Sequence, residues 1–279
     1  MALPRLAITA ADISTALSEL GVAPTDTMLV HSDLQSSLRV VGRTVPDKVA
    51  TIAEGLRGAV RDGTLVLPTF TYSFTRGEDF DVDASPSTVG ALTEWFRRRP
   101  GVRRTPEPLF SVAIDGPIPP EWEEPLFDLG DKDCFGPASI FAYLEAAEAK
   151  LVCYGVDIQA LTFAHYVEQR LSVPYRLMKD FHGAVRRADE QREVTATYYV
   201  RELTTETEVH LHPLADALLR EGRARTSLLP DGPRLLVTDT ASVLEVSRRE
   251  LASNPDFLLR RGHPDITSPR PPPRAGWRR

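Results

Sequence analysis

The sequence predicts an α/β layered fold, and three observations lead to that prediction. Short apolar runs typical of buried strands recur along the chain, as in TMLVH, GTLVLPTF and KLVCYG. Segments with the apolar spacing of amphipathic helices separate these runs. The chain has 279 residues, of which 42% are hydrophobic and 26% charged, enough for one large domain with a substantial core.

The first helix has clear start and stop signals. Thr9, followed by Asp12, resembles a capping box, and Gly21 suits the turn that ends a helix. The apolar residues between them fall on one helical face: Ile13, Leu17 and Leu20. The apolar run TMLVH, residues 27–31, then predicts a buried strand.

The alternation of helix and strand continues through the first half of the chain. Three further helices are expected: over about 46–60, from about Ser87 with Leu92, Trp95 and Phe96 facing inward, and over 136–149 with Pro137 in its first turn. Three further strands are expected: 63–70, 109–115 and 150–155.

Past Arg176 the pattern changes. REVTATYYVREL, residues 192–203, alternates like an exposed antiparallel strand. A helix is expected at about 214–220, and a strand at 234–239 leads into a last helix that ends near Ser253.

Composition argues against several classes of protein. The net charge of −6 disfavours a nucleic-acid partner. No apolar run approaches the ~20 residues that span a bilayer, and the N-terminus lacks a basic region followed by an apolar one, so we expect a cytoplasmic protein without a membrane partner.

Cys134 and Cys153 lie outside any CxxC pattern and are expected to be reduced and structural. We expect one domain over 1–262 and a disordered Pro/Arg-rich tail over 263–279.

Hydroxyl-rich loops follow two of the predicted strands. VHSDLQSSLRVVG, residues 30–42, comes at the end of the first strand, and PTFTYSF, residues 68–74, at the end of the second. At the carboxyl ends of strands, loop N–H groups and serine hydroxyls can cradle phosphate oxygens. Taken alone, the first loop is more often a plain polar connection, since it is neither a P-loop nor GxGxxG.

Another anion site is indicated at SPSTVGALTEWF, residues 85–96. Ser87, Thr88 and Gly90 lie at the predicted N-terminus of a helix. Unpaired backbone donors and the positive end of the helix dipole suit an anion there. Simple N-capping by Ser87 is the alternative interpretation, and the two are compatible.

TFAHYVEQR, residues 162–170, places His165 and Glu168 on neighbouring positions of one helix face. An imidazole can accept a proton near neutral pH, and a carboxylate can orient it and stabilise the imidazolium. From the spacing alone, a structural pair is the more frequent outcome.

Metal and serine-hydrolase sites have less support. The pair is not part of an HExxH motif, and no third ligand stands nearby. VHLHP, residues 209–213, offers His210 and His212 on one face of a strand, but ordinary surface histidines are favoured there. No GxSxG elbow occurs in the sequence.

Acidic residues cluster in GEDFDVD, residues 77–83, and in EWEEPLFDLGDKD, residues 121–133. Such runs usually solvate loops. If either run lines a cleft, it would attract a polycationic ligand and raise its encounter rate.

Several of these segments, in their order, carry a resemblance to a known family. They are VHSDLQSSL, GTLVLPTFTYSF, SPSTVGALTEWFRRRPGVRRTPEPLFSVAIDG, GPAS, and LVCYGVDIQALTFAHYVEQR with VPYR behind it. Together they resemble the aminoglycoside 3-N-acetyltransferase family, which is distinct from the GNAT fold, from about Leu17 to Arg260. The third segment, residues 85–116, is the most specific. Where many members read RSxHP, this chain reads RTPEP, with Glu107 in the place of the histidine.

The resemblance implies a central, largely antiparallel (mixed) sheet sandwiched between helices. It also implies acetyl-CoA, or another acyl-CoA, as co-substrate, an amine as acceptor and no metal. His165 matches the family's catalytic histidine and Glu168 its companion glutamate. The residues that the resemblance assigns to the coenzyme are His31, Ser32, Leu34, Ser36, Ser37, Thr71, Ser87, Thr88, Val89 and Gly90. Those that it assigns to the acceptor are Tyr72, Glu107, Asp157 and Tyr175, with acceptor-side elements mostly within 72–135 and 176–235.

The resulting hypothesis is an N-acetyltransferase that moves an acyl group from coenzyme A to an amine of an aminoglycoside or amino-sugar-like molecule. His165 would act as general base in direct attack, since no cysteine stands in the matched catalytic positions. A biosynthetic acyltransferase for an amino nucleotide or another metabolite is the main alternative. A non-catalytic coenzyme A-binding module is another, and a metal-dependent hydrolase comes third. The expected partner is a small amine, and the expected state is a monomer or homodimer.

Overall fold

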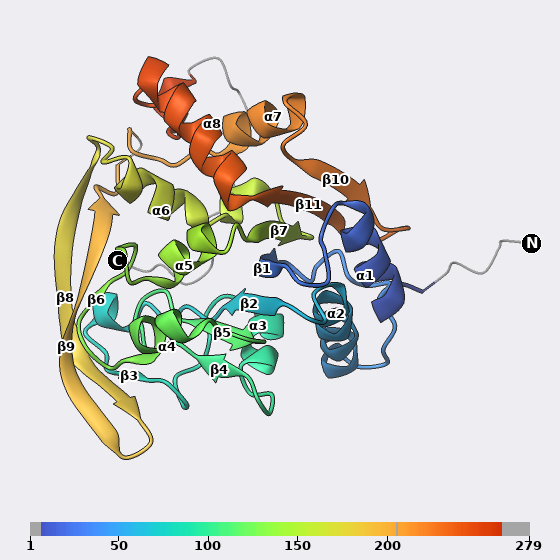
Figure 1. Cartoon of the computed structure of the whole chain (residues 1–279), viewed down its shortest axis with the longest axis horizontal. Coiled ribbons are helices and arrows are strands. Elements are labelled where there is room, and N and C mark those ends of the chain that lie inside the picture. The colour runs from blue at the N-terminus through green and yellow to red at the C-terminus, as the bar shows by residue number, and fades with distance from the viewer. Residues whose placement is uncertain (1–6, 205, 264–279) are drawn as a thin grey trace, which may run out of the picture.

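A seven-stranded mixed sheet forms the centre of the protein (Figure 1). The structure is a computed structural model that describes residues 7–204 and 206–263. The strand order is β10-β11-β7-β1-β2-β5-β4. The strands are β1 (Thr27–Ser32), β2 (Thr64–Pro68), β4 (Arg103–Arg104), β5 (Val112–Asp115), β7 (Lys150–Tyr154), β10 (Arg225–Leu228) and β11 (Arg234–Asp239).

The three central strands of this sheet are parallel, and the outer ones are antiparallel. Strand β1 pairs in parallel with both β7 and β2, whereas the other four pairings are antiparallel. The expected mixed, largely antiparallel sheet is therefore confirmed. Its parallel centre has a consequence for the site, because the carboxyl ends of parallel strands meet at one edge.

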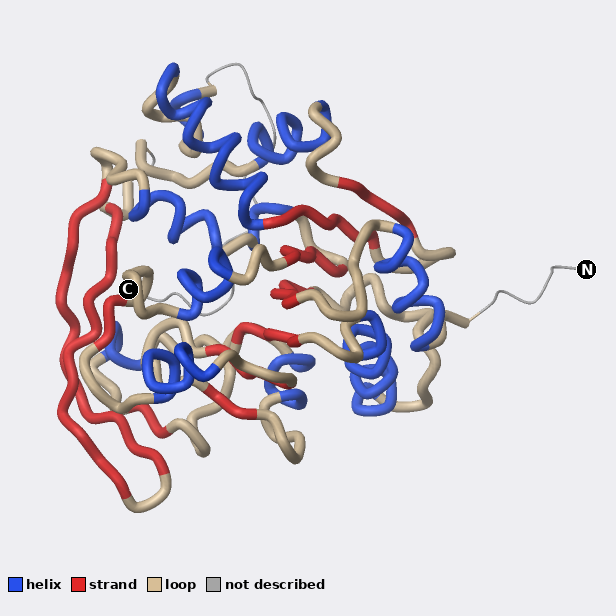
Figure 2. Tube along the Cα trace, in the orientation of Figure 1, coloured by secondary structure: helices blue, strands red, loops and turns tan. Residues whose placement is uncertain are grey.

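Helices cover both faces of the sheet (Figure 2). One face carries α1 (Ala10–Glu19), α2 (Val45–Ala59) and α3 (Ala91–Phe96), and the other carries α5 (Ile140–Ala146), α6 (Phe163–Arg170), α7 (His212–Arg220) and α8 (Thr240–Ser253). Side chains alternate along each strand, so Leu29 enters one core while Met28 and Val30 enter the other. Each face buries its own apolar cluster, which explains the continuous apolar runs in the sequence.

A second sheet of four strands lies beside the first, in the order β3-β8-β9-β6. Its strands are β3 (Phe80–Asp81), β6 (Lys132–Asp133), β8 (Arg176–Arg187) and β9 (Glu190–Arg201). Strands β8 and β9 form a long hairpin along one side of the molecule (Figure 1). The alternating pattern of 192–203 predicted β9 correctly, but β8 was not expected. The remaining elements are α4 (Pro120–Phe127) and the short 3-10 helices η1 (Ser73–Arg76), η2 (Ile158–Ala160) and η3 (Arg260–Gly262).

The two acidic runs fasten this hairpin to the rest of the protein. Asp79 pairs with Arg186 of β8 at 2.8 Å and accepts a hydrogen bond from the backbone of Ala184. From the second run, Asp131 accepts a hydrogen bond from the Thr195 N–H of β9 at 2.7 Å. These carboxylates therefore have structural partners.

Most of the predicted helices are confirmed, with two corrections at their starts. The capping box of Thr9 and Asp12 is present at α1. Helix α3 begins at Ala91, not near Ser87, and α5 begins after its N-cap Ser139, so that Pro137 lies outside the helix. The VHLHP segment is not a strand with two exposed histidines, because Val209 forms only an isolated bridge, His210 is buried and His212 opens α7.

Several other expectations concern the chain as a whole. Cys134 and Cys153 are free and buried, as expected. Over residues 7–204 and 206–263, no helix has the length and apolar character needed to cross a membrane. The expected disordered tail lies outside the described residues from position 264 onward.

Helices α1 and α2 pack so closely at Gly55 that a side chain there has no room. A Cβ at Gly55 would lie 2.7 Å from Ile13 Cβ and 2.8 Å from the Ala10 carbonyl oxygen. We predict that Gly55→Ala lowers the free energy of unfolding by about 1–3 kcal/mol, because the helices must move apart. The measurement is urea denaturation followed by circular dichroism.

Gly58 of the same helix supplies the matched control. A Cβ at Gly58 would lie 3.6 Å from Ser14 Cβ, an ordinary contact. Gly58→Ala is expected to stabilise the protein by up to about 1 kcal/mol, because alanine favours the helix. Equal effects of the two substitutions would contradict the close packing.

Candidate active site

The candidate site lies where the parallel strands β1, β2 and β7 end. A loop follows each of β1 and β2 at this edge, and β7 leads through η2 into α6. His31, near the end of β1, accepts a hydrogen bond at Nε2 from the Thr162 N–H, with the two nitrogens 3.4 Å apart. This contact joins the end of the first strand to the start of α6, the helix that carries His165.

His165 and Glu168 form a direct pair on α6. The His165 Nδ1 and Glu168 Oε2 atoms are 2.7 Å apart, as the i, i+3 spacing predicts. The Glu168 side chain is completely buried, whereas the His165 side chain is 25% exposed. The buried carboxylate therefore holds one ring nitrogen, and the ring itself keeps an opening to solvent. Among the described residues, Nε2 of His165 has no hydrogen-bond partner.

Arg176, at the first position of β8, is the third member of this cluster. Its Nη2 lies 2.6 Å from Glu168 Oε2, and its side chain is 1% exposed. The same nitrogen lies 2.9 Å from His165 Nδ1, and Nη1 donates to the Tyr199 carbonyl of β9 at 2.9 Å. From the sequence, Arg176 was noted only as the last residue of the VPYR segment and was given no role. Its place at the end of that segment, which resembles the family, was the one feature that could have pointed to it.

The charges of this cluster favour a neutral imidazole beside an ionised carboxylate. Burial lowers the pKa of His165, the Arg176 charge lowers it further, and Glu168 only partly opposes them. Burial alone would raise the pKa of Glu168, but Arg176 and His165 outweigh it and hold that pKa below its ordinary value. At neutral pH the ring can therefore accept a proton.

Aromatic side chains line one side of His165. Phe135 meets the imidazole edge to face with the ring centroids 6.0 Å apart, and Tyr198 lies 5.8 Å from Phe135. Tyr72, expected on the acceptor side, joins the same group through Phe110 at 5.5 Å. This side of His165 is therefore aromatic, whereas the charged groups lie on the side of Glu168.

Tyr175, the second tyrosine expected on the acceptor side, directly precedes Arg176. Its hydroxyl oxygen is buried. Burial, and next the Glu168 carboxylate, raise the pKa of Tyr175 well above its ordinary value. Tyr175 therefore stays protonated beside the pair.

The loop after β1 contains two buried hydroxyls. Among the residues that the structure describes, Ser36 Oγ has no hydrogen-bond partner, whereas the Ser37 hydroxyl interacts with that of Tyr154. Gly155 adopts a φ of +67°, and a Cβ there would lie 2.7 Å from Ser36 Oγ. Ser32 ends the strand, and Leu34 packs against the core on the α1–α2 face. Buried hydroxyls cost free energy unless they are paired, so this loop suits a ligand with hydrogen-bonding groups, such as coenzyme A.

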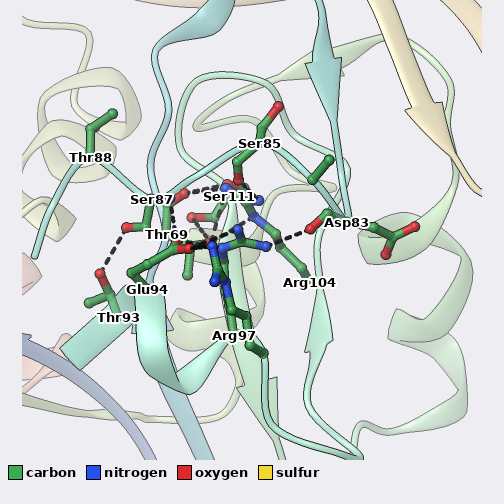
Figure 3. Close-up of polar contacts among 12 residues, drawn as sticks. Thr69, Asp83, Ser85, Ser87, Thr88, Thr93, Glu94, Arg97, Arg104 and Ser111 are labelled. Carbon is green, nitrogen blue, oxygen red and sulfur yellow. Dashed lines mark hydrogen bonds and ion pairs between the residues drawn. The ribbon is translucent and has the colours of Figure 1, made fainter. Parts of the chain in front are cut away.

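The turn before α3 is built differently from the prediction. The Ser87 N–H donates to the Glu94 carboxylate at 2.7 Å, and the Ser87 hydroxyl lies 2.8 Å from that of Thr93 (Figure 3). Gly90, not Ser87, is the N-cap of α3, because the helix begins only at Ala91 and the Ser87 hydroxyl meets that of Thr93 instead. Thr88 bonds to the Phe70 carbonyl through both its N–H and its hydroxyl, each at 2.9 Å.

The other two positions of the expected coenzyme turn, and Thr71, can also be placed. Val89 packs half-buried against the core, and Gly90 is exposed, with nothing within 4 Å of the position of an added Cβ. Thr71 is buried and donates to the Pro108 carbonyl at 2.7 Å. A ligand can approach the backbone more closely at Gly90 than at the other residues, because glycine has no side chain.

Arg104 locks the strand ends beneath this turn (Figure 3). It donates from Nη2 to the Thr69 carbonyl at 2.7 Å, from Nη1 to the Val82 carbonyl at 3.1 Å and from Nε to Ser111 Oγ at 3.2 Å. Burial, followed by the charge of Arg97, lowers the pKa of Arg104 to about 9, so it stays charged at neutral pH. Its fixed fork of donors binds three separate segments together.

Two carboxylates expected on the acceptor side, Glu107 and Asp157, already accept hydrogen bonds from backbone N–H groups of the protein. Glu107 is buried and accepts hydrogen bonds from the N–H groups of Leu109, at 2.9 Å, and Phe110. Burial raises the pKa of Glu107 to about 7. Asp157 accepts from the Gln159 N–H at 2.7 Å, as the cap of η2, although its side chain remains largely exposed.

The two histidines of VHLHP do lie together. Their Nδ1 atoms are 3.4 Å apart, and His212 Nε2 lies 3.3 Å from Asp157 Oδ2. Within the described part of the chain, however, no three or more His, Cys, Asp or Glu side chains are arranged to hold a metal ion.

Comparison with known proteins agrees with this fold. A family model described as aminoglycoside 3-N-acetyltransferase matches residues 29–249. Aminoglycoside N(3)-acetyltransferase IV of Salmonella sp is 33% identical over 168 residues, which span 59% of this chain and 60% of that protein. Aminoglycoside N(3)-acetyltransferase VIII of Streptomyces fradiae is 28% identical over 179 residues, which span 57% of this chain and 59% of that protein. The matches thus cover about three fifths of these relatives.

Solved structures share the fold over a larger part of the chain. Aminoglycoside acetyltransferase AAC(3)-Xa has a TM-score of 0.74 and 23% identity, covering 91% of this chain and 94% of that one. AAC-IIIb, in a binary complex with CoASH, has a TM-score of 0.71 and 21% identity, covering 88% and 97%. The chain belongs to the aminoglycoside 3-N-acetyltransferase family.

The contacts of Arg104 predict that lysine cannot replace it. We expect Arg104→Lys to lower the free energy of unfolding by about 3 kcal/mol, because one ammonium group cannot reach all the carbonyls that the guanidinium bonds. Chemical denaturation measures the difference. Arg103→Lys is the matched control, since Arg103 makes a half-exposed ion pair with Glu123 at 2.7 Å and should cost about 1 kcal/mol or less. If Arg104→Lys lowers the free energy of unfolding no more than Arg103→Lys does, the proposed role of Arg104 in joining the three segments is contradicted.

Proposed function

We propose that this protein is an acetyl-CoA-dependent N-acetyltransferase that acts on an amine of an aminoglycoside. The observation that carries the proposal is the His165–Glu168 pair, 2.7 Å apart, at the carboxyl edge of the parallel strands in a chain of this family. A neutral imidazole whose Nδ1 is held by a buried carboxylate is equipped to accept a proton at Nε2.

The donor side of the proposal rests on the loop after β1 and the turn before α3. The Ser36 hydroxyl has no partner among the described residues and is the one proposed to bond to the coenzyme, and the exposed backbone at Gly90 can be approached closely by it. Thr71, Ser87 and Thr88 are bonded within the protein and would shape the site rather than supply free hydroxyls. A solved structure of the same fold contains CoASH, which supports the choice of donor.

The proposed reaction is a direct transfer. His165 Nε2 takes a proton from the acceptor amine as its nitrogen attacks the thioester carbon, and Glu168 stabilises the imidazolium that forms. The carbon–sulfur bond then breaks, and the imidazolium returns the proton to the leaving sulfur, so coenzyme A departs as a thiol. A cysteine intermediate lacks support, because burial raises the pKa of Cys153 to about 12 and that of Cys134 well above its ordinary value.

The ion pairs of the acidic runs favour a second class of acceptor, an amine that carries fewer positive charges than an aminoglycoside. The acidic runs would favour a polycation only if their carboxylates were free, yet Glu123 pairs with Arg103 and Asp79 with Arg186. An amine with fewer positive charges, such as an amino nucleotide or another metabolite, is therefore the alternative acceptor. The names of the relatives favour the aminoglycoside.

We predict that the protein releases free thiol from acetyl-CoA in the presence of an aminoglycoside, and that His165→Ala lowers kcat by between about 100- and 10,000-fold. The assay covers aminoglycosides, amino sugars and amino nucleotides. Calorimetry should show unchanged coenzyme A binding in the variant, since the base is not expected to hold the coenzyme.

His182→Ala is the control, because it removes an exposed histidine of β8 and should leave the rate unchanged. Absence of turnover with every amine, together with coenzyme A binding, would favour the non-catalytic module over the enzyme.

The electrostatics of the site also predict a pH profile. Because the pKa of His165 is lowered, the ring stays neutral, and the enzyme active, to a pH below the ordinary histidine value of 6.5. Activity falls only when the pH drops through this lowered pKa and the base becomes protonated. The profile of kcat/KM against pH measures the position of this acid limb, and a limb above 6.5 would rule out His165 in this environment as the base.

A further inference from the structure

We infer that Arg176 is a positioning residue, which selects the nitrogen of His165 that carries the proton and returns the imidazolium to its neutral form. This inference rests on the proposed function, in which His165 is the base. Arg176 is not expected to touch either substrate, because its side chain is buried and all its contacts are with protein groups.

The geometry is a triangle of three polar atoms. Glu168 Oε2 lies 2.7 Å from His165 Nδ1 and 2.6 Å from Arg176 Nη2, and the two nitrogens are 2.9 Å apart. All three distances permit a hydrogen bond, but the protons cannot satisfy all three sides at once.

Only two arrangements of protons fit a neutral imidazole. In the first, Nδ1–H and the Arg176 Nη2–H both point at the Glu168 oxygen, and Nε2 is left with its lone pair. In the second, Nη2–H points at a bare Nδ1, and the proton sits on Nε2, where the ring can no longer accept one. The first arrangement gives both donors a charged acceptor, and charge-assisted hydrogen bonds are roughly twice as strong as neutral ones. Arg176 therefore favours the tautomer that can act as base, provided that Glu168 remains ionised.

Arg176 also supplies the condition for that ionisation. A fully buried carboxylate is stable in its charged form only beside a positive charge or several donors. The Arg176 guanidinium supplies that positive charge before any proton is transferred. Glu168 can therefore stay ionised while His165 is neutral. Without Arg176, a proton taken from the substrate would be held by Glu168 and His165 together.

The same charge prevents the imidazolium from becoming too stable. Once His165 is protonated, its ring faces an ionised Glu168 on one side and the Arg176 cation 2.9 Å away. The other charged or titratable groups that bear on the cluster are Arg201, Tyr198 and Tyr199 of β9, and Tyr175. Arg201 acts in the same direction as Arg176, and the three tyrosines remain neutral because their pKa values are raised, chiefly by burial. The balance favours return of the proton to the leaving sulfur, which completes the reaction.

Arg176 is held in place from the second sheet. Its Nη1 donates to the Tyr199 carbonyl, which fixes the guanidinium relative to β9 while Nη2 meets the residues of α6. A lysine at this position would keep the charge, but it could not bridge the helix and the sheet with a planar fork.

The test is nuclear magnetic resonance of the histidine side chains, with His165 assigned by its loss in His165→Ala. In the wild-type protein, the nitrogen shifts should show the Nδ1–H tautomer near neutral pH, and a proton on Nε2 would overturn the inference. In Arg176→Met, the pKa of His165 should rise by about one unit or more, because a nearby like charge is removed. An unchanged pKa in a folded variant would also overturn it.

Two further variants separate charge from structure. Arg176→Lys should bring the pKa of His165 back toward the wild-type value, while kcat stays below wild type because the fork is lost. Arg201→Met removes a neighbouring cation, and its effect on that pKa should be smaller. A shift in Arg201→Met as large as in Arg176→Met would contradict the specific role of Arg176. If Arg176→Met does not fold, the wild-type tautomer decides the question.

These measurements do not require turnover. Should no amine be acetylated, the tautomer and the pKa values still show whether Arg176 controls His165, so the two proposals fail separately. When turnover is present, the acid limb of kcat/KM should move to higher pH in Arg176→Met and return toward wild type in Arg176→Lys.

Discussion

The parallel pairing of β1 with β7 and β2 is the constraint on which the rest of the site depends. The register runs from Met28 opposite Lys150 to Ser32 opposite Tyr154, so both strands end at the same level. The loop of Ser36 and Ser37 therefore lies close to the chain that leaves β7, where Gly155 leaves room for it. The same edge receives the start of α6 through the contact between His31 and Thr162. The proposed coenzyme loop and the proposed base, from distant parts of the sequence, thus meet at one end of the sheet.

Local features of the site could be predicted from the sequence, whereas features made by distant segments could not. His165 and Glu168 lie one helical turn apart, so their spacing alone placed them together. Arg176 follows Glu168 by eight residues, but its contact depends on the course of β8, and no local pattern revealed that strand. The N-capping role considered for Ser87 was wrong for a similar reason, because the helix begins only at Ala91 and the Ser87 hydroxyl meets Thr93 across the turn.

Arginine side chains, two of them buried and one exposed, organise much of the molecule. Arg104 joins strand ends through carbonyl oxygens, Arg176 joins a helix to the second sheet, and Arg186 ties the hairpin to the loop at Asp79. The negative net charge of the chain therefore gives little information about the site. Many carboxylates serve these arginines, and composition could not distinguish such internal pairs from a surface that attracts a cation.

The attachment of the β8–β9 hairpin has a consequence for how the protein could diversify. At the Arg176 end, the hairpin is bonded to Glu168 of α6, so changes there would disturb the proposed catalytic pair. Toward the turn between β8 and β9, it meets the body through short strands and exposed ion pairs, as at Asp79 and Arg186. Sequence drift in that outer part would leave the proposed base and the proposed coenzyme loop intact. The fold thus ties one end of the hairpin to the proposed catalytic pair and leaves the other end tolerant of change.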